Sequence, residues 1–152
     1  MAALKAEPAR ASSQTVLIDL NVILDVLQHR QPQYEHAARL WVAVEQRRLR
    51  GLLAAHSVTT LFYLLARHLS SDQAHATIRD LLAVFSVATV DESVIREAIG
   101  LGWKDFEDAV QMAAAIRAGT SALITGNTSD FKGGPIRVLT PAEVPALLLA
   151  SS

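Results

Sequence analysis

Three groups of polar side chains in this sequence have types and spacings that could do chemistry. Asp19 directly follows a short apolar run, and Asp105 and Asp108 lie three residues apart. A second apolar run is followed by Thr125, Asn127 and Asp130. Carboxylates that meet at one point repel each other unless a cation neutralises them, and oxygen ligands without cysteine favour Mg²⁺ or Mn²⁺. Such an ion beside acidic residues would suit the attack of water on a phosphodiester.

Each of these acids also has a purely structural explanation. An Asp at the end of a strand or in the first turn of a helix commonly caps the helix and complements its dipole. Asp25 and Asp91 are interpreted in this way. The interpretation as a functional site therefore depends on the three groups coming together.

The elements that must position these residues alternate along the chain. Apolar runs predict strands at 15–18, 52–55, 86–90, 122–124 and 136–139. Caps, breakers and apolar periodicity predict helices at 22–27 (capped by Asn21), 32–48 (ended by Gly51), 57–69, 71–85, 91–100, 105–118 and from 141 onward. This alternation predicts a three-layer α/β/α sandwich with a mainly parallel sheet of about five strands. Ligands of such sheets bind beyond the carboxyl ends of the strands, where the acidic groups would meet.

Composition narrows the class of protein. The 152 residues are 51% hydrophobic and carry a net charge of −1, which predicts one folded domain and excludes a globally basic nucleic-acid binder. We expect a flexible N-terminal segment at 1–14 and a single domain at 15–150. Without cysteine there is no disulfide, thiolate metal site or Cys nucleophile, which fits a cytoplasmic location. Apolar runs too short to span a membrane, and the lack of a signal sequence, predict no membrane association.

Four segments resemble the motifs of PIN-domain ribonucleases. Residues 17–25 (LIDLNVILD) resemble the family's opening pattern, and 105–109 (DFEDA) its acidic motif in the middle of the chain. Residues 124–131 (ITGNTSDF) are similar to its Thr-x-Asn/Asp-x-x-Asp-Phe motif, and 138–143 (VLTPAE) to a common ending. The resemblance extends over about 15–148, with the motifs in order. Many family members of this size are toxins of bacterial toxin–antitoxin pairs.

The resemblance implies a role for each matched residue. Asp19 and Asp108 would be metal ligands for Mg²⁺ or Mn²⁺, with Asp105 close to the ion. Asn127 stands where many members carry an acid, Asp130 follows as in the family pattern, and the Thr125 hydroxyl would orient ligands or water. The implied substrate is RNA and the implied partner is an antitoxin protein, while a homodimer is left open.

Thr60 departs from the family pattern, because members usually place Glu, or in some branches Asn, at this position of the helix after the second strand. With Asn127, the site carries fewer negative charges than a set of four acids, which predicts weaker metal binding and slow or absent catalysis. Two hypotheses remain: a metal-dependent endoribonuclease that is a toxin, and a catalytically weakened PIN-like module that binds RNA or protein. A phosphatase with Asp19 as nucleophile is disfavoured, because Asn21 stands where a second Asp is expected and no glycine-rich phosphate loop is present.

Overall fold

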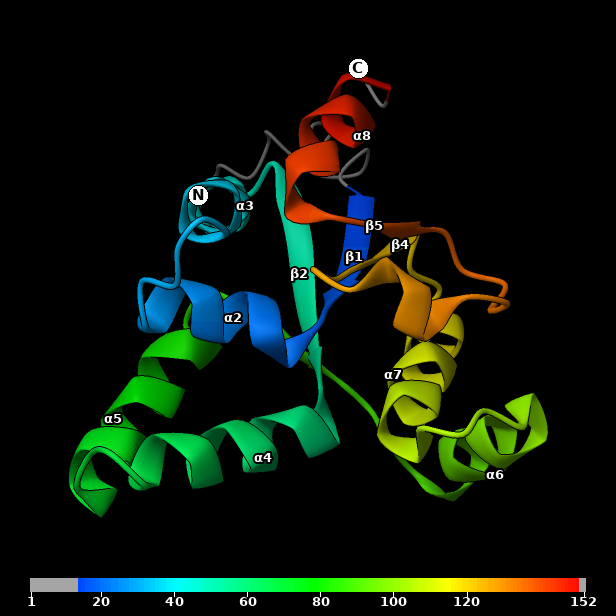
Figure 1. The fold of residues 1–152 in the computed structure, drawn as a ribbon, viewed down its shortest axis with the longest axis horizontal. Coiled ribbons are helices and arrows are strands. Elements are labelled where there is room, and N and C mark those ends of the chain that lie inside the picture. The colour runs from blue at the N-terminus through cyan, green and yellow to red at the C-terminus, as the bar shows by residue number, and fades with distance from the viewer. Residues whose placement is uncertain (1–13, 151–152) are drawn as a thin grey trace, which may run out of the picture.

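The sheet has five strands, all of them paired in parallel. The computed structural model describes residues 14–150, so the expected N-terminal segment lies outside the described residues apart from Gln14, which begins the first strand. The strands are β1 (Gln14–Ile18), β2 (Leu49–Ala54), β3 (Ser86–Ala88), β4 (Ala122–Ile124) and β5 (Val138–Leu139). They lie in the order β3-β2-β1-β4-β5. Figure 1 labels β2, β1, β4 and β5. The predicted parallel sheet is confirmed.

Helices connect the strands and cover both faces of the sheet (Figure 1). They are α2 (Leu20–Leu27), α3 (Tyr34–Glu45), α4 (Ala55–Ala66), α5 (Ser71–Leu82), α6 (Glu92–Leu101), α7 (Phe106–Arg117) and α8 (Val144–Ala150). Two short 3₁₀ helices follow β4 and β5: η2 (Thr128–Phe131) and η3 (Pro141–Glu143). Within residues 14–150, no helix is both long and apolar enough to cross a membrane.

Alternate side chains of the strands enter two separate cores, which makes the fold three-layered. In β1, Val16 and Ile18 pack with residues of α2, α3, α4, α5 and α8 on one face of the sheet. Leu17 points to the other face and packs with residues of α6, α7 and η2. Val16, Leu17 and Ile18 are fully buried, so this part of β1 is a continuous apolar run, as is typical of parallel sheets. The predicted α/β/α sandwich is therefore confirmed.

The strand order places a topological switch point between β1 and β4. From β1 the chain moves outward to β2 and β3, and later returns to the other side of β1 through β4 and β5. The backbone N–H of Asp19 donates to the Ile124 carbonyl at 2.8 Å, so the carboxyl ends of β1 and β4 lie side by side. Ligands of open parallel sheets bind at such a point.

Several local expectations are wrong. Asp19, not Asn21, caps α2, because its carboxylate accepts from the backbone N–H of Asn21. Gly51 does not end α3 but lies inside β2, where an added Cβ would come within 2.9 Å of the Phe85 ring. Tyr63 in α4, an aromatic residue that would suit a core position, is 66% exposed. Apolar sequence alone did not show which side of α4 faces solvent.

Candidate active site

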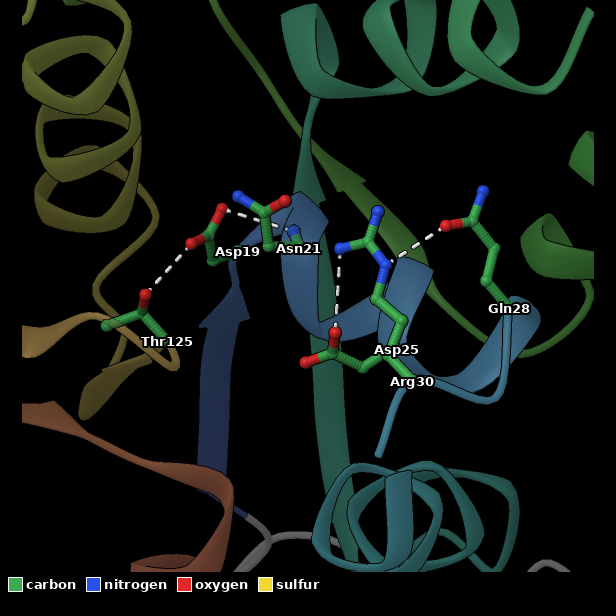
Figure 2. A network of polar contacts seen from close by, with 6 residues as sticks. All are labelled: Asp19, Asn21, Asp25, Gln28, Arg30 and Thr125. Atoms are coloured by element: carbon green, nitrogen blue, oxygen red, sulfur yellow. Dashed lines mark hydrogen bonds and ion pairs between the residues drawn. The ribbon is translucent and has the colours of Figure 1, made fainter. Parts of the chain in front are cut away.

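Asp19 is held by three hydrogen-bond donors at the switch point. The residue is only 6% exposed, and its Oδ2 accepts from the Thr125 hydroxyl at 2.8 Å. Its Oδ1 accepts from the backbone N–H of Asn21 at 3.4 Å and from Nε2 of Gln111 at 3.3 Å. Figure 2 shows Thr125 and Asn21 approaching opposite sides of the carboxylate. A carboxylate has about four acceptor positions, so Asp19 is fixed in orientation and can still bind a further ligand.

The segment after β4 supplies the second predicted group. Thr125 is fully buried, and its hydroxyl accepts from the backbone N–H of Asn127 at 3.1 Å while donating to Asp19. The side-chain amide of Asn127 donates to Oδ2 of Asp130 at 2.8 Å. Thr125 therefore connects this segment directly to Asp19, whereas the side chains of Asn127 and Asp130 bind each other at the exposed rim.

The first turn of α7 supplies the third group. Asp105 caps the helix by accepting from the backbone N–H of Asp108 at 3.1 Å. Burial raises the pKa of Asp108 to about 7, and the negative charges of Asp105, Asp19 and Asp130 add to the effect. Four carboxylates from three separate parts of the chain are therefore close enough to influence one another, as the sequence predicts. At neutral pH one of them retains a proton for a large fraction of the time.

Thr60 lies beside the acidic helix, at the junction of α4 and α7. Its hydroxyl lies 3.2 Å from the His56 carbonyl and 3.4 Å from Oε2 of Glu107. Burial lowers the pKa of His56, and the charge of Glu107 and a hydrogen bond with its backbone oppose that shift. Thr60 therefore contacts the residue that precedes Asp108 in the sequence.

Gln111 and Glu107 are polar residues near the site that the sequence analysis missed. Gln111 is 3% exposed and lies one helical turn after Asp108, on the same face of α7. A polar residue three positions from Asp108, in a segment that is otherwise alanine and other apolar residues, was a signal that could have found it. Glu107 gave no such signal, because its role depends on how α4 packs against α7.

Asp25, the last acid of the opening motif, pairs with a neighbouring arginine. Its carboxylate lies 3.6 Å from the Arg30 guanidinium, which also donates to Gln28 at 3.0 Å (Figure 2). Burial raises the pKa of Asp25, and Arg30 opposes that shift. The pair is away from Thr125 and joins the end of α2 to the turn that follows it.

The donor set is chemically suited to a hydrated divalent ion. Among the described residues, no three His, Cys, Asp or Glu side chains are close enough to form a complete protein cage for a metal. Mg²⁺ usually keeps several waters and binds through one or two carboxylates, so a complete cage is not needed. Burial is the largest cause of the raised pKa of Asp108, and a cation would neutralise the like charges that add to the shift. Asp19 and Asp108 fit such an ion.

Comparisons with known proteins agree with the motifs. The family model described as "PIN domain" matches residues 15–129. A curated relative, Ribonuclease VapC1 of Aquifex aeolicus, is 25% identical over 137 residues, which cover 87% of this chain and 94% of the relative.

Solved structures share the fold. VapBC-1 from nontypeable Haemophilus influenzae matches with a TM-score of 0.66 and 14% identity, covering 84% of this chain and 98% of that one. A toxin–antitoxin complex from Klebsiella pneumoniae matches with a TM-score of 0.64 and 22% identity, covering 83% and 97%. VapC20 from Mycobacterium tuberculosis, a toxin that cleaves the sarcin–ricin loop, matches with a TM-score of 0.60 and 18% identity, covering 80% and 98%.

Proposed function

The chain belongs to the PIN-domain family, and from that membership we propose that it is a metal-dependent endoribonuclease, the toxin of a toxin–antitoxin pair. The observation that carries this proposal is the meeting of Asp19 and Asp108 at the switch point of the sheet, with Asp105 and Asp130 beside them. The relative named Ribonuclease VapC1, which matches over most of both chains, supports the choice of reaction.

In this proposal, the role of each site residue follows from its position. Asp19 and Asp108 would hold the ion, Mg²⁺ or Mn²⁺, which when bound supplies activation of water and neutralisation of charge on the phosphate. Thr125 and the Asn21 backbone fix the Asp19 carboxylate before any ligand arrives, so its orientation costs nothing during binding. Asp105 and Asp130 add negative charge around Asp108 and so favour a cation. Asn127 restrains Asp130 at the rim.

A cleavage assay tests this proposal. Purified protein is incubated with a labelled single-stranded RNA, with Mn²⁺, with Mg²⁺ and with a chelator. We expect cleavage only with metal, and a loss of at least a hundredfold in Asp19→Asn, because the variant keeps the helix cap but lacks the charge. Asp91→Asn is the matched control, since Asp91 also caps a helix, through the backbone N–H of Val94. Equal losses in both variants, or cleavage that persists with the chelator, would reject the proposal.

The proposed partner is a protein antitoxin whose basic side chains bind the acidic site. Solved relatives include a toxin–antitoxin complex, and Arg or Lys is the natural counter-charge for clustered carboxylates. Purification of the protein from its own host at several growth stages, followed by mass spectrometry, should recover a stoichiometric small protein. The contrary result is recovery of the free chain at every stage.

A catalytically weakened module is the second candidate, and Thr60 favours it. The helix after β2 offers a hydroxyl rather than an acid, and that hydroxyl is close to Glu107. Such a module would bind the same RNA and leave it intact with Mn²⁺ present. Binding and cleavage measured on one RNA therefore separate the two functions.

A further inference from the structure

The side-chain amide of Gln111 is buried, and its two polar atoms differ in hydrogen bonding. Its Nε2 donates to Oδ1 of Asp19 at 3.3 Å, whereas its Oε1 has no hydrogen-bond partner within residues 14–150. The residue is 3% exposed. A buried acceptor without a donor is unfavourable, and such groups are rare in folded proteins unless something else binds them.

The orientation of this amide is fixed by its neighbour. Only the NH₂ side of an amide can face a carboxylate, because the carbonyl oxygen would meet another acceptor. Thr125 and the Asn21 backbone hold the Asp19 carboxylate, so the amide cannot turn over without losing its bond to Asp19. Oε1 is attached to the same carbon as Nε2 and therefore lies close to Asp19, one helical turn from Asp108.

We propose that Gln111 is a positioning residue of the metal site: Nε2 orients Asp19, and Oε1 accepts a hydrogen bond from a water molecule that hydrates the bound ion. This inference rests on the proposed function, since it requires a divalent ion at Asp19 and Asp108. Hydrated ions bring O–H donors into a site, and groups that orient the ligands of a metal contribute to its affinity. A neutral amide can do both tasks, whereas a carboxylate at position 111 would repel Asp19 when the ion is absent.

A purely structural role is the competing explanation. Gln111 could serve only to bind Asp19, with Oε1 left unsatisfied. In that case the orphaned oxygen would gain nothing from an ion, and its removal would not alter metal affinity beyond the effect of freeing Asp19. The two explanations therefore predict different responses to Mn²⁺ when Oε1 of Gln111 is replaced by another oxygen, and not only when it is removed.

The experiment measures Mn²⁺ binding by calorimetry and the melting temperature with and without Mn²⁺, so its readouts do not depend on RNA cleavage. Gln111→Met keeps the length and the volume of the side chain and removes both polar atoms. Gln111→Glu keeps an oxygen in place of Oε1 and adds a charge. Thr120→Val is the matched control, because Thr120 is also buried, and its hydroxyl donates to the Ala115 carbonyl, at the other end of α7.

We expect Gln111→Met to weaken Mn²⁺ binding about tenfold or more and Thr120→Val to leave it unchanged. We expect Mn²⁺ to raise the melting temperature of Gln111→Glu by more than that of the wild type, because the ion would neutralise the added charge. Unchanged affinity in Gln111→Met, or no larger Mn²⁺ effect in Gln111→Glu, overturns the inference while the proposed function stands. If the wild type binds no Mn²⁺, both are rejected.

Discussion

The hydroxyl of Thr125 donates to Oδ2 of Asp19 at 2.8 Å, although the two residues are 106 positions apart in the sequence. Asp19 follows β1 and Thr125 follows β4. These strands are neighbours because the chain adds β2 and β3 on one side of β1 and then β4 and β5 on the other side. The bond therefore exists only when the sheet is assembled. It links folding of the sheet to the orientation of the carboxylate that would bind the ion.

Replacing Thr125 by Val should separate these two contributions. Val keeps the shape but removes the hydroxyl, and Asp19 is then buried with one fewer donor. We expect a loss of about 1–3 kcal/mol in the free energy of unfolding, the usual range for breaking a buried hydrogen bond to a charged group. Urea denaturation measures it, and Thr125→Ser, which keeps the hydroxyl, is the control. If Ser and Val variants lose the same stability, the cause is packing and not the bond.

Mn²⁺ or Mg²⁺ should raise the melting temperature of the wild type. A ligand that binds only the folded protein stabilises it by mass action, by about 2.7 kcal/mol at a concentration one hundred times the dissociation constant. Asp19→Asn should remove most of this rise, because it removes one of the two proposed anionic ligands. Thermal melts at increasing Mn²⁺ measure the effect. A rise that is as large in Asp19→Asn would mean that the ion binds elsewhere.

The pKa of Asp108 predicts how the metal-free protein responds to pH. The folded protein holds this proton up to a pH of about 7, whereas the ordinary value is 3.8. Between these values the unfolded chain has released a proton that the folded chain retains, so rising pH favours unfolding. Stability should therefore fall as pH rises from 3.8 to about 7 and then level off.

Asp108→Asn should lack this component of the pH dependence. Its stability relative to the wild type should increase across the same pH range, by about 1 kcal/mol once screening of a partly exposed group is allowed for. The lowered pKa of His56 acts in the opposite direction but is common to both proteins, so it cancels in the difference. Urea denaturation in a chelator at several pH values measures it. A difference that is constant with pH would contradict the raised pKa.

The strands and the main acidic positions could be predicted from the sequence because each has a local cause. β1 is apolar from Val16 to Ile18 because both faces are covered there, and Asp105 caps α7 through a neighbour three residues away. The resemblance to the family then matched Asp19, Asp108 and Thr125 to known motif positions. These features need no knowledge of how distant helices pack.

Contacts between elements could not be predicted in this way. The Thr60–Glu107 contact depends on the approach of α4 to α7 across 47 residues, and the exposure of Tyr63 depends on which sides of α4 are covered by other elements. Gln111 carried a visible polar signal, yet its bond to Asp19 spans 92 residues. The position of Gly51 was misread because a glycine ends a helix as readily as it allows close packing within a strand.

Thr60→Glu is the substitution that tests how the helix after β2 contributes to the site. If Thr60 faces the ion, the added carboxylate should tighten Mn²⁺ binding about tenfold, since affinity rises with the number of charged ligands. The gain should vanish in an Asp19→Asn background, because the two groups would share one ion and so be non-additive. Calorimetry on the wild type, both single variants and the double variant measures this, with cleavage of single-stranded RNA followed in parallel.

The contact with Glu107 adds a condition to this test. A carboxylate at position 60 would lie against Glu107, so Thr60→Glu should lower the melting temperature without Mn²⁺, and adding Glu107→Gln should restore it. Thr59→Glu is the matched control, since the neighbouring Thr59 is exposed and its hydroxyl likewise donates to the His56 carbonyl, at 2.8 Å. Equal Mn²⁺ affinity in the position-59 and position-60 variants would mean that Thr60 does not face the ion. The absence of an acid at position 60 would then no longer be a reason to expect weakened catalysis.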